Sequence, residues 1–383
     1  MTEDDLWSKP FDQHTIAKHK ILGAYISAWA PILLHSFEKK IVYIDGFAGR
    51  GEDVNGKPGS PLIAINAIAN NRALSDISNK KVLMLFIEIN PTTKAYLDDV
   101  LKKKVSDLKK LIDYEVHEGD FVSTLKELLG TLKSSGYKLA PTFCFVDPYG
   151  WEVLDLDLFA EFMAEKKAEL FITFMVGFID RFSTDEKSKK ALSKLFKAEQ
   201  LEAMNKAKTN DEKEELTVAF FVENLKSKIK DKNIFNISFA VKGKSNNTIY
   251  HLVYLTAHPA GMRVMKDAMY NVKKDYNYSF SDHEDDFKQK SIIDYTKEKV
   301  WIPEAANDIH TKLLGQTQEI GWVENYITTV TKWRYRTQIL TFLEKARELK
   351  YLGQRTRKGY TYNDKKAKVE FCNATKNQTT IPQ

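Results

Sequence analysis

The sequence has little cysteine and no long apolar run. Its 383 residues include two cysteines, Cys144 and Cys372, which are too few for a disulfide framework or a cysteine zinc site. No stretch approaches the roughly 20 apolar residues that a membrane-spanning helix needs. The first residues, MTEDDLWSKP, are acidic and lack the basic-then-apolar order of a signal peptide. These absences predict a protein of a reducing cytoplasm, without a membrane span.

Charged residues are abundant but unevenly placed. The net charge is +6, yet the stretch 332–370 alone holds twelve Lys or Arg and four Asp or Glu, a local charge of +8. The remainder of the chain therefore carries −2. A basic segment on a near-neutral body predicts a polyanionic partner, DNA or RNA. A solvated charged face is the alternative reading of the same pattern.

Strands alternate with helices through the first half of the chain, which predicts a parallel sheet with helices on both faces. We expect this α/β domain to span 1–275, with a charged helical insertion at about 183–232 that precedes a closing antiparallel hairpin. A polar linker is expected at 276–300, a second domain at 301–370 and a tail at 371–383. Two or three domains suit a chain of this length, at about 100–200 residues each.

Local signals set several element boundaries. Pro31 is expected to end or kink an amphipathic helix over 13–30. Ser60 followed by Pro61 predicts an N-cap with proline at the first helical position. The stretch 351–363, YLGQRTRKGYTYN, predicts two short strands around a basic turn. Helices followed by such a hairpin are typical of a winged helix-turn-helix, in which one helix enters a groove and the wing touches backbone.

The first buried strand ends in the loop IDGFAGRG, of the form D-x-F-x-G-x-G. Its pattern residues are Asp45, Gly46, Phe47, Gly49 and Gly51. Because glycine lets the backbone approach a ligand closely, the loop predicts a nucleotide-type ligand, with an ordinary turn as the alternative. No Lys-Ser/Thr follows, so this is not a triphosphate P-loop, and the loop also departs from the dinucleotide pattern G-x-G-x-x-G.

Acidic residues end the next two strands. Glu88 ends the second, the position where a carboxylate takes the ribose hydroxyls of a bound nucleoside. Asp120 follows the third and either accepts from an adenine amino group or N-caps the following helix, and the residues alone do not choose between the two. Parallel sheets bind ligands at the carboxyl ends of their strands, so we expect these loops to converge.

The fourth strand ends in VDPYGW, with Asp147, Pro148 and Tyr149 in sequence. A carboxylate followed by proline and an aromatic suits an amino group as target. The Asp oxygen and a following backbone carbonyl accept its two N–H bonds, and the aromatic can stack on a base displaced from its helix. The alternative is a strand-to-turn transition, in which proline fixes φ and glycine ends the turn.

Cations alternate with an aromatic around Trp333, as on many nucleic-acid-binding surfaces. The residues predicted to contact nucleic acid are Lys332, Arg334 and Arg336, with the wing residues Arg355, Arg357 and Lys358 on phosphate. Docking of a protein by the wing is the alternative. His251 and His258 flank a strand but have no third ligand at metal spacing, so no metal site is predicted.

The order of these motifs resembles a class I S-adenosylmethionine-dependent methyltransferase. The D-P-Y step is similar to the D-P-P-Y motif of amino methyltransferases acting on adenine. The fuller combination, YIDGFAGRG, FIEIN and FVDPYGW with a C-terminal winged helix, resembles the three-Cys-motif partner (TcmP) family over most of the chain. Those bacterial methyltransferase-like proteins occur beside a three-Cys-motif protein.

The resemblance implies a Rossmann-like class I methyltransferase sheet that binds S-adenosylmethionine. It places the glycine loop at the methionine end of the cofactor, Glu88 on the ribose and Asp120 on the adenine. Asp147, Pro148 and Tyr149 take the place of the catalytic motif, with one proline where D-P-P-Y has two. His14, Lys18 and Lys20 lie where some amino methylases close over the methionine end, although an ordinary amphipathic helix also explains them.

We therefore predict a methyltransferase for nucleic acid, with an exocyclic amino group as the expected acceptor. The absence of a Pro-Cys nucleophile argues against methylation of a cytosine carbon. One alternative is a cofactor-binding partner or recruiting subunit of a neighbouring enzyme, without turnover of its own and with the three-Cys-motif protein as candidate partner. Another is a methyltransferase for a small molecule or a protein.

Overall fold

The computed structural model describes nine stretches of the chain: 9–36, 38–105, 111–151, 153–176, 192–245, 247–273, 278–281, 292–353 and 361–373. The chain divides into two compact units. Unit 1 comprises Met1–Lys273 with Asn277–Asp286, and unit 2 comprises Lys274–Tyr276 with Phe287–Gln383. Within the described stretches, no helix is long and apolar enough to cross a bilayer.

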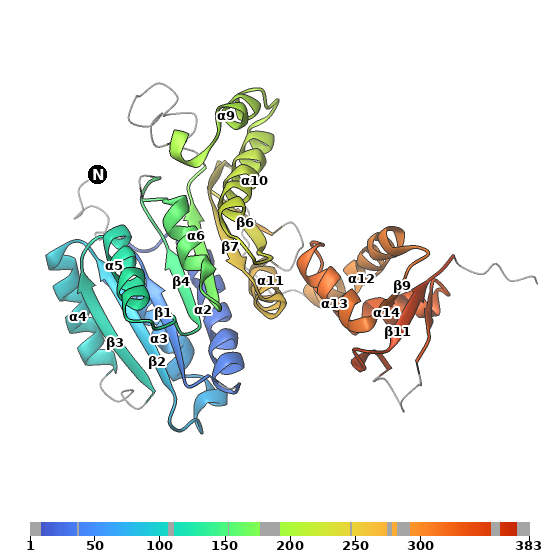
Figure 1. Cartoon of the computed structure of the whole chain (residues 1–383), viewed down its shortest axis with the longest axis horizontal. Helices are drawn as coiled ribbons and strands as arrows, with labels where there is room; N and C mark the ends of the chain where they lie inside the picture. Colours follow the sequence, from blue (N-terminus) through green and yellow to red (C-terminus); the bar gives the residue numbers. More distant parts are fainter. Residues whose placement is uncertain are drawn as a thin grey trace, which may run out of the picture. The chain divides into compact units, whose positions relative to one another are not determined.

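Unit 1 is built on an eight-stranded sheet of order β3-β2-β1-β4-β5-β7-β6-β8 (Figure 1). Its strands are β1 (Lys40–Asp45), β2 (Lys81–Glu88), β3 (Ile112–Glu118), β4 (Thr142–Val146), β5 (Ala168–Phe174), β6 (Phe235–Lys242), β7 (Thr248–Thr256) and β8 (Ser279–Ser281). The first five strands pair in parallel. β7 runs antiparallel to both β5 and β6, which confirms the predicted closing hairpin.

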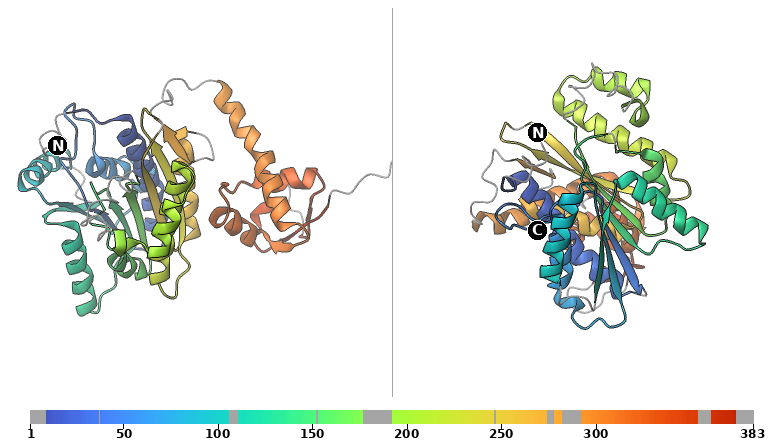
Figure 2. Two further views of the ribbon diagram at one scale, coloured as in Figure 1. Left: turned by 90° about the horizontal axis from the view of Figure 1, so that it is seen from above. Right: turned by 90° about the vertical axis from the view of Figure 1, so that its left-hand side faces the viewer.

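Helices cover both faces of this sheet. They are α2 (Gln13–Leu34), α3 (Ser60–Ala69), α4 (Pro91–Val105), α5 (Phe121–Ser134), α6 (Leu156–Ala164), α9 (Ala198–Asn205), α10 (Asn210–Lys228) and α11 (Pro259–Lys273), with a short 3-10 turn at Arg72–Leu74. On one face α2 packs on α3 and α11, and on the other α6 packs on α5 and α10. Figure 2 shows α10 beside the yellow strands β6 and β7.

The sequences of the two central strands, β4 and β5, are almost continuously apolar because helices cover both faces of the sheet there. Every residue of β4 and β5 is buried, including Cys144 as predicted. Glu169 is the charged exception, on the α2 face. Its Oε2 accepts from the hydroxyl of Tyr25 at 2.6 Å and its Oε1 from that of Thr256 at 3.1 Å.

Of the two outcomes predicted at Pro31, an end or a kink, the end does not occur, because α2 runs on to Leu34. Proline removes the N–H that would bond the carbonyl of Ser27 four residues earlier. The Asn71 side chain supplies the missing donor, with its Nδ2 at 2.6 Å from that carbonyl oxygen. A residue 40 positions further along the chain thus makes the proline tolerable inside the helix.

The start of α3 also differs from the prediction. Gly59 is the N-cap, so Ser60 and Pro61 occupy the first two helical positions. The Ser60 hydroxyl is buried and bonds to Asp45 instead of capping the helix.

Unit 2 combines three helices with a small antiparallel sheet of order β10-β11-β9. Its elements are α12 (Ile292–Leu313), β9 (Thr317–Glu319), α13 (Ile320–Thr329), α14 (Thr337–Lys345), β10 (Leu349–Tyr351), a 3-10 turn (Thr361–Asn363) and β11 (Lys368–Phe371). Apolar residues of all three helices and of β11 form its core: Ala305, Ile309, Val323, Ile327, Ile339, Leu343, Val369 and Phe371.

Two boundaries in this part of the chain differ from those expected. The second strand of the predicted hairpin is β11, because Thr361–Asn363 forms a 3-10 turn that buries Tyr362 against α14. The Tyr362 hydroxyl donates to Glu344 Oε2 at 2.8 Å. In addition, β8 and the start of α12 lie within the range 276–300 that was expected to be a linker.

Candidate functional site

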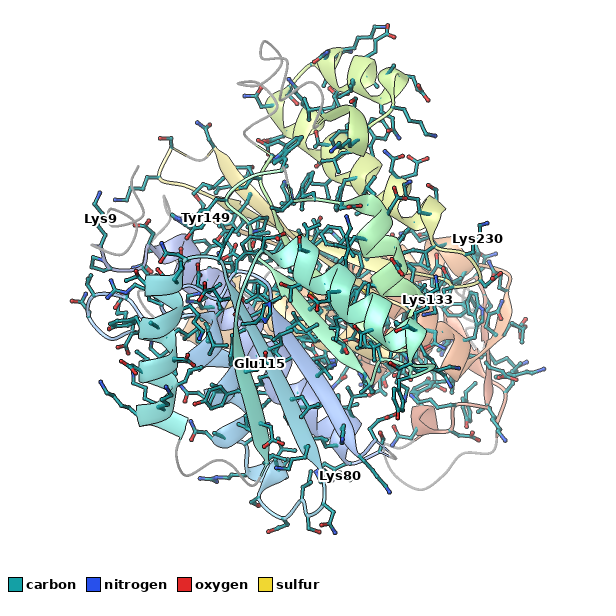
Figure 3. All side chains as sticks on the ribbon, turned by 60° about the vertical axis from the view of Figure 1, so that its left-hand side comes forward. Lys9, Lys80, Glu115, Lys133, Tyr149 and Lys230 are labelled. Atoms are coloured by element: carbon teal, nitrogen blue, oxygen red, sulfur yellow. The ribbon has the colours of Figure 1, made fainter. Side chains whose placement is uncertain are left out.

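The carboxyl ends of β1, β2, β3 and β4 lie at one end of the sheet in unit 1. Figure 3 shows Lys9 and Tyr149 at this end and Lys80, which precedes β2, at the other. The parallel pairing puts each strand-end loop beside the next. The amide of Gly46 donates to the carbonyl of Phe145, and the amide of Ala48 to that of Ile87.

Asp45 organises the glycine loop from beneath. It is fully buried and accepts from the Phe47 amide and the Tyr43 hydroxyl, each at 3.3 Å, and from Ser60. Burial raises the pKa of Asp45 to about 7, although these hydrogen bonds oppose the rise. Its side chain therefore fixes the loop conformation and does not line the cavity described below.

The loop needs glycine at two positions. Gly49 and Gly51 have φ of 61° and 81°, a region that other residues adopt only with strain. The carbonyl of Gly51 accepts from the Gly59 amide at 2.7 Å, and this bond closes the loop against the start of α3. Gly46 is confined in a different way, because an added Cβ would lie 2.5 Å from the ring of Phe121.

Glu88 joins this loop to the end of β2. Its Oε2 accepts from the Gly49 amide and its Oε1 from the Asn90 amide, both at 2.9 Å. The side chain is 9% exposed, so these bonds hold a buried carboxylate in one orientation. The next residue, Ile89, is 66% exposed and presents an apolar surface beside it.

Asp120 is the N-cap of α5, as one of its two readings predicted. Its Oδ1 accepts from the Ser123 amide at 3.0 Å, and hydrogen bonds from Ser123 hold its pKa below the usual value. This bond alone accounts for an aspartate at the position. A contact with adenine stays a prediction.

Asp147 pairs with a lysine 129 positions earlier in the sequence. Lys18 of α2 donates from its Nζ to Asp147 Oδ2, and its side chain is 8% exposed. The Lys18 Nζ also lies 5.4 Å from the centre of the Tyr250 ring. Trp151 anchors the loop that follows Asp147, since its indole N–H donates to the carbonyl of Met175. Tyr149, by contrast, is 64% exposed.

A cavity of about 390 Å³ connects these parts. Its lining comes from four regions: the N-terminal segment with α2 (Lys9, Pro10, Phe11, Asp12, His14, Thr15, Lys18, His19), the glycine loop with the start of α3 (Phe47, Ala48, Gly51, Gly59, Ser60), the ends of β4 and β5 (Asp147, Pro148, Tyr149, Met175) and the start of β7 (Ile249, Tyr250). Glu88 and Asp120 are not part of this lining.

The sequence did not single out the N-terminal wall of this cavity beyond listing His14 and Lys18 as an open alternative. The Tyr250 hydroxyl donates to the carbonyl of His14 at 2.9 Å. Burial, and then the charge of Lys18, lower the pKa of His19 to about 3, so this ring is neutral. No local pattern reveals these roles, because α2 meets β4 and β7 only after the sheet has formed.

Asp53 holds that N-terminal wall against the glycine loop. It is 5% exposed, and its carboxylate accepts from the amides of Phe11, Asn55 and Lys57 at 2.8–3.1 Å. These hydrogen bonds also keep the pKa of Asp53 below its usual value. In the sequence, Asp53 follows Gly51 and Glu52, and no local pattern there predicts its contact with Phe11.

Three of the residues predicted to contact nucleic acid in unit 2 lie in the part of the chain that the structure describes, and they differ in exposure. Lys332 is exposed and Arg336 is half-buried. Arg334 is only 5% exposed and lies over the Trp301 ring, 5.8 Å from its centre, so it is not placed for phosphate contact. The ring of Trp333 is buried against the same tryptophan. The predicted wing residues Arg355, Arg357 and Lys358 lie outside the described residues.

Among the side chains that the structure describes, no three His, Cys, Asp or Glu residues group closely enough to hold a metal ion. The charged and titratable side chains that line the cavity are the carboxylates Asp12 and Asp147, the lysines Lys9 and Lys18 and the imidazoles His14 and His19.

The strand order β3-β2-β1-β4-β5-β7-β6, with β7 antiparallel, is that of a Rossmann-like class I methyltransferase fold. No family model matches the chain, and no curated protein sequence matches it. Among solved structures, the chain is similar to protein LPL1258 from Legionella pneumophila (family model DUF519), at 13% identity and a TM-score of 0.38 over 67% of this chain and 91% of that one. It is also similar to the methyltransferase domain of bacterial CtHen1-C, at 8% identity and a TM-score of 0.32 over 63% and 98%. Likeness at these scores carries no activity over, and the fold assignment rests on the strand order.

Proposed function

We propose that the chain is an S-adenosylmethionine-dependent methyltransferase that acts on nucleic acid, with an exocyclic amino group as acceptor. One observation carries this proposal: a single cavity is lined both by the glycine loop and by Asp147, Pro148 and Tyr149. Methyl transfer requires donor and acceptor to be held in line within one site. These two loops are the ones that would hold them.

The residues present fit the cofactor. Gly51, with a φ of 81°, lines the cavity and has no side chain, so the backbone of the loop can approach a ligand there. A carboxylate offers about four lone-pair positions, so Glu88 can accept ribose hydroxyls in addition to its two amides. Ile89 offers an exposed apolar face to the adenine. When bound, the cofactor supplies an electrophilic methyl group.

The acceptor is positioned by the chain's own residues. Lys18 donates to Asp147 Oδ2, so Oδ1 is the oxygen that would accept an N–H of the acceptor amine. A backbone carbonyl of the following turn would accept the second N–H. Asp147 then stabilises the positive charge that develops on the amine nitrogen as it is methylated. The ring of Tyr149 lines the cavity and is 64% exposed, so it would stack on the displaced base.

Unit 2 supports nucleic acid as the substrate. We propose that it is a winged helix, and its order of helices and strands, α12-β9-α13-α14-β10-β11 with β11 between the other two strands, supports this proposal. In this assignment α14 is the helix that would enter a groove, with Gln338 and Lys345 exposed along it. The local charge of +8 over 332–370 would attract the phosphate backbone.

A second candidate function is a cofactor-binding module without turnover, which serves as the partner or recruiting subunit of another protein. The pairing of Lys18 with Asp147 favours it, because Lys18 already occupies one oxygen of the carboxylate that would bind the acceptor. The resemblance to the TcmP family, on which a three-Cys-motif protein as partner depends, rests on the sequence motifs, and the proposed cytoplasmic location rests on the scarcity of cysteine.

Calorimetric titration with S-adenosylmethionine and S-adenosylhomocysteine tests the cofactor site. Glu88→Gln should weaken binding about 10-fold or more, since hydrogen bonds to a charged group contribute about 1.5–3 kcal/mol. Glu127→Gln, at an exposed position of α5 away from the strand ends, is the matched control and should bind as the parent does. A folded parent protein that binds neither compound would contradict the proposal.

Transfer of labelled methyl groups to DNA and RNA tests the reaction. Asp147→Asn should keep cofactor affinity within about 3-fold but lower the transfer rate about 100-fold, the typical effect of removing one charge-stabilising group. Asp157→Asn, on an exposed turn of α6, is the control. Cofactor binding by the parent without methylation of either nucleic acid would favour the module without turnover.

A further inference from the structure

A second cavity of unit 1, of about 740 Å³, lies on the opposite side of β7 from the first. Helix α10 packs on α6 and leaves a groove over strands β6 and β7. The strand side of this groove is polar, with Asn236 and Ser238 half-buried on β6. A sheet face covered by a helix is normally filled by apolar side chains, so this polar gap is unusual.

His251 indicates that the groove is a binding site. It lines the cavity from β7 and is 8% exposed. Neither ring nitrogen has a hydrogen-bond partner among the described residues. The Oε2 of Glu214 lies 4.0 Å from Nε2, beyond hydrogen-bond distance. A buried polar group left unsatisfied costs about 1–3 kcal/mol, so an imidazole at this position indicates a ligand or a bonded neighbour that completes it.

The other lining groups define the chemistry of that ligand. Glu215 and Glu223 lie on the exposed rim of α10, and Val218 and Val222 form an apolar wall below them. Carboxylates and an imidazole nitrogen accept hydrogen bonds, so the ligand must donate them and carry positive charge. The apolar wall suits the methylene groups of such a cation. The positively charged Lys226 also lines the groove, and its Nζ donates a hydrogen bond to Asn236 Oδ1 at 2.6 Å.

We propose that this groove binds an amphipathic organic cation, an alkyl ammonium or alkyl guanidinium, whose head donates to the His251 imidazole and to the carboxylates of α10. A volume of about 740 Å³ lies in the range of small-ligand pockets. The net charge of the chain is +6, so a cation has no general attraction to the protein and requires a local site. The same chemistry occurs in a free polyamine and in a basic side chain of a peptide.

Calorimetric titration of the full-length protein with spermidine, and separately with N-acetylarginine amide, tests the proposal. At least one probe should bind with a dissociation constant below about 1 mM. Tighter binding of spermidine identifies a free polyamine as the ligand type, and tighter binding of the arginine derivative identifies a basic side chain. Failure of both probes to bind at millimolar concentration overturns the proposal.

Variants locate the binding. His251→Leu should lower affinity at least 10-fold while leaving the melting temperature at or above that of the parent, because the imidazole nitrogens lack partners in the free protein. Glu223→Gln should weaken binding about 3-fold, as expected for an exposed charge. Glu199→Gln, an exposed carboxylate of α9 outside the groove, is the control.

The glutamate variant keeps the test decisive if His251→Leu fails to fold, since Glu223 is exposed on α10. Nitrogen-15 spectra of histidine-labelled protein give a second readout, in which the His251 ring signals should shift on saturation with the bound probe. Equal affinity of the parent and Glu223→Gln, or an unshifted His251 ring, would refute the assignment.

Discussion

Replacing Glu169 with glutamine is expected to remove a pH dependence from the stability of unit 1. Glu169 is buried within the sheet, and burial raises its pKa from 4.5 to about 7, although hydrogen bonds from Tyr25 and Thr256 oppose the rise. The folded protein therefore binds this proton more tightly than the unfolded chain does. The resulting stabilisation is fully present below pH 4.5 and is lost as the pH rises to about 7.

The size of the effect follows from the two pKa values. One unit of pKa difference corresponds to about 1.4 kcal/mol. Between pH 5 and pH 8, a carboxyl that titrates at 4.5 when unfolded and at about 7 when folded loses roughly 2.5 kcal/mol of stabilisation. Glutamine does not titrate, so the free energy of unfolding of the variant should lack this component. Asp45, whose pKa is raised in the same direction, is present in both proteins and cancels in their difference.

Urea unfolding of the parent and Glu169→Gln at half-unit steps from pH 5 to pH 8 measures this difference. We expect the parent to lose about 2.5 kcal/mol relative to the variant across this range. Glu199→Gln serves as the exposed control. If the free energies of unfolding of the parent and Glu169→Gln change equally with pH, the buried carboxyl does not have the raised pKa.

Three further substitutions test the glycine loop and the wall of the first cavity. Gly51→Ala should destabilise the protein by about 1–2 kcal/mol through its φ of 81° and weaken cofactor binding in calorimetry. Gly56→Ala, with a φ of 71° and no crowding of the added methyl group, should show the strain without the binding defect. Lys18→Met should leave Asp147 without its cation and lower the free energy of unfolding by about 1–3 kcal/mol in urea. Asp53→Ala should accelerate amide hydrogen exchange at Phe11, because the Phe11 amide donates a hydrogen bond to the Asp53 carboxylate.

Each of these substitutions has an outcome that would contradict its basis. Equal cofactor affinity of Gly51→Ala and Gly56→Ala would show that the glycine loop does not contact the cofactor. Lys20→Met is the control for Lys18→Met, and equal stability of the two variants would show that the ion pair with Asp147 contributes nothing. Unchanged exchange at Phe11 would show that the N-terminal segment is held by other contacts.

The strands and their terminal residues could be predicted from the sequence because each signal was local. Buried parallel strands read as apolar runs, and the acidic or glycine-bearing residue after each run is visible without knowledge of the fold. Asp147 and Gly51 therefore lie in one cavity, as the expected convergence of strand ends required. The buried Cys144 followed from the same pattern.

The differences between sequence and structure involve contacts between distant residues. The Lys18–Asp147 pair spans 129 positions, and the Asn71 side chain that supports Pro31 is equally invisible to a local pattern. Arg334 looked like a surface cation because it alternates with aromatics, yet the Trp301 ring covers it. Helix periodicity and charge spacing do not report which partner a side chain finds.

The contact between Tyr250 and His14 has a consequence for how the protein is made. These residues are 236 positions apart, and together they form two sides of the first cavity. A ribosome delivers the N-terminal wall first and β7 much later, so the cavity cannot close until translation has passed Tyr250. The glycine loop and the strands up to β5 can assemble before that point, so the site is completed late in the synthesis of unit 1, shortly before α11 and β8 are added.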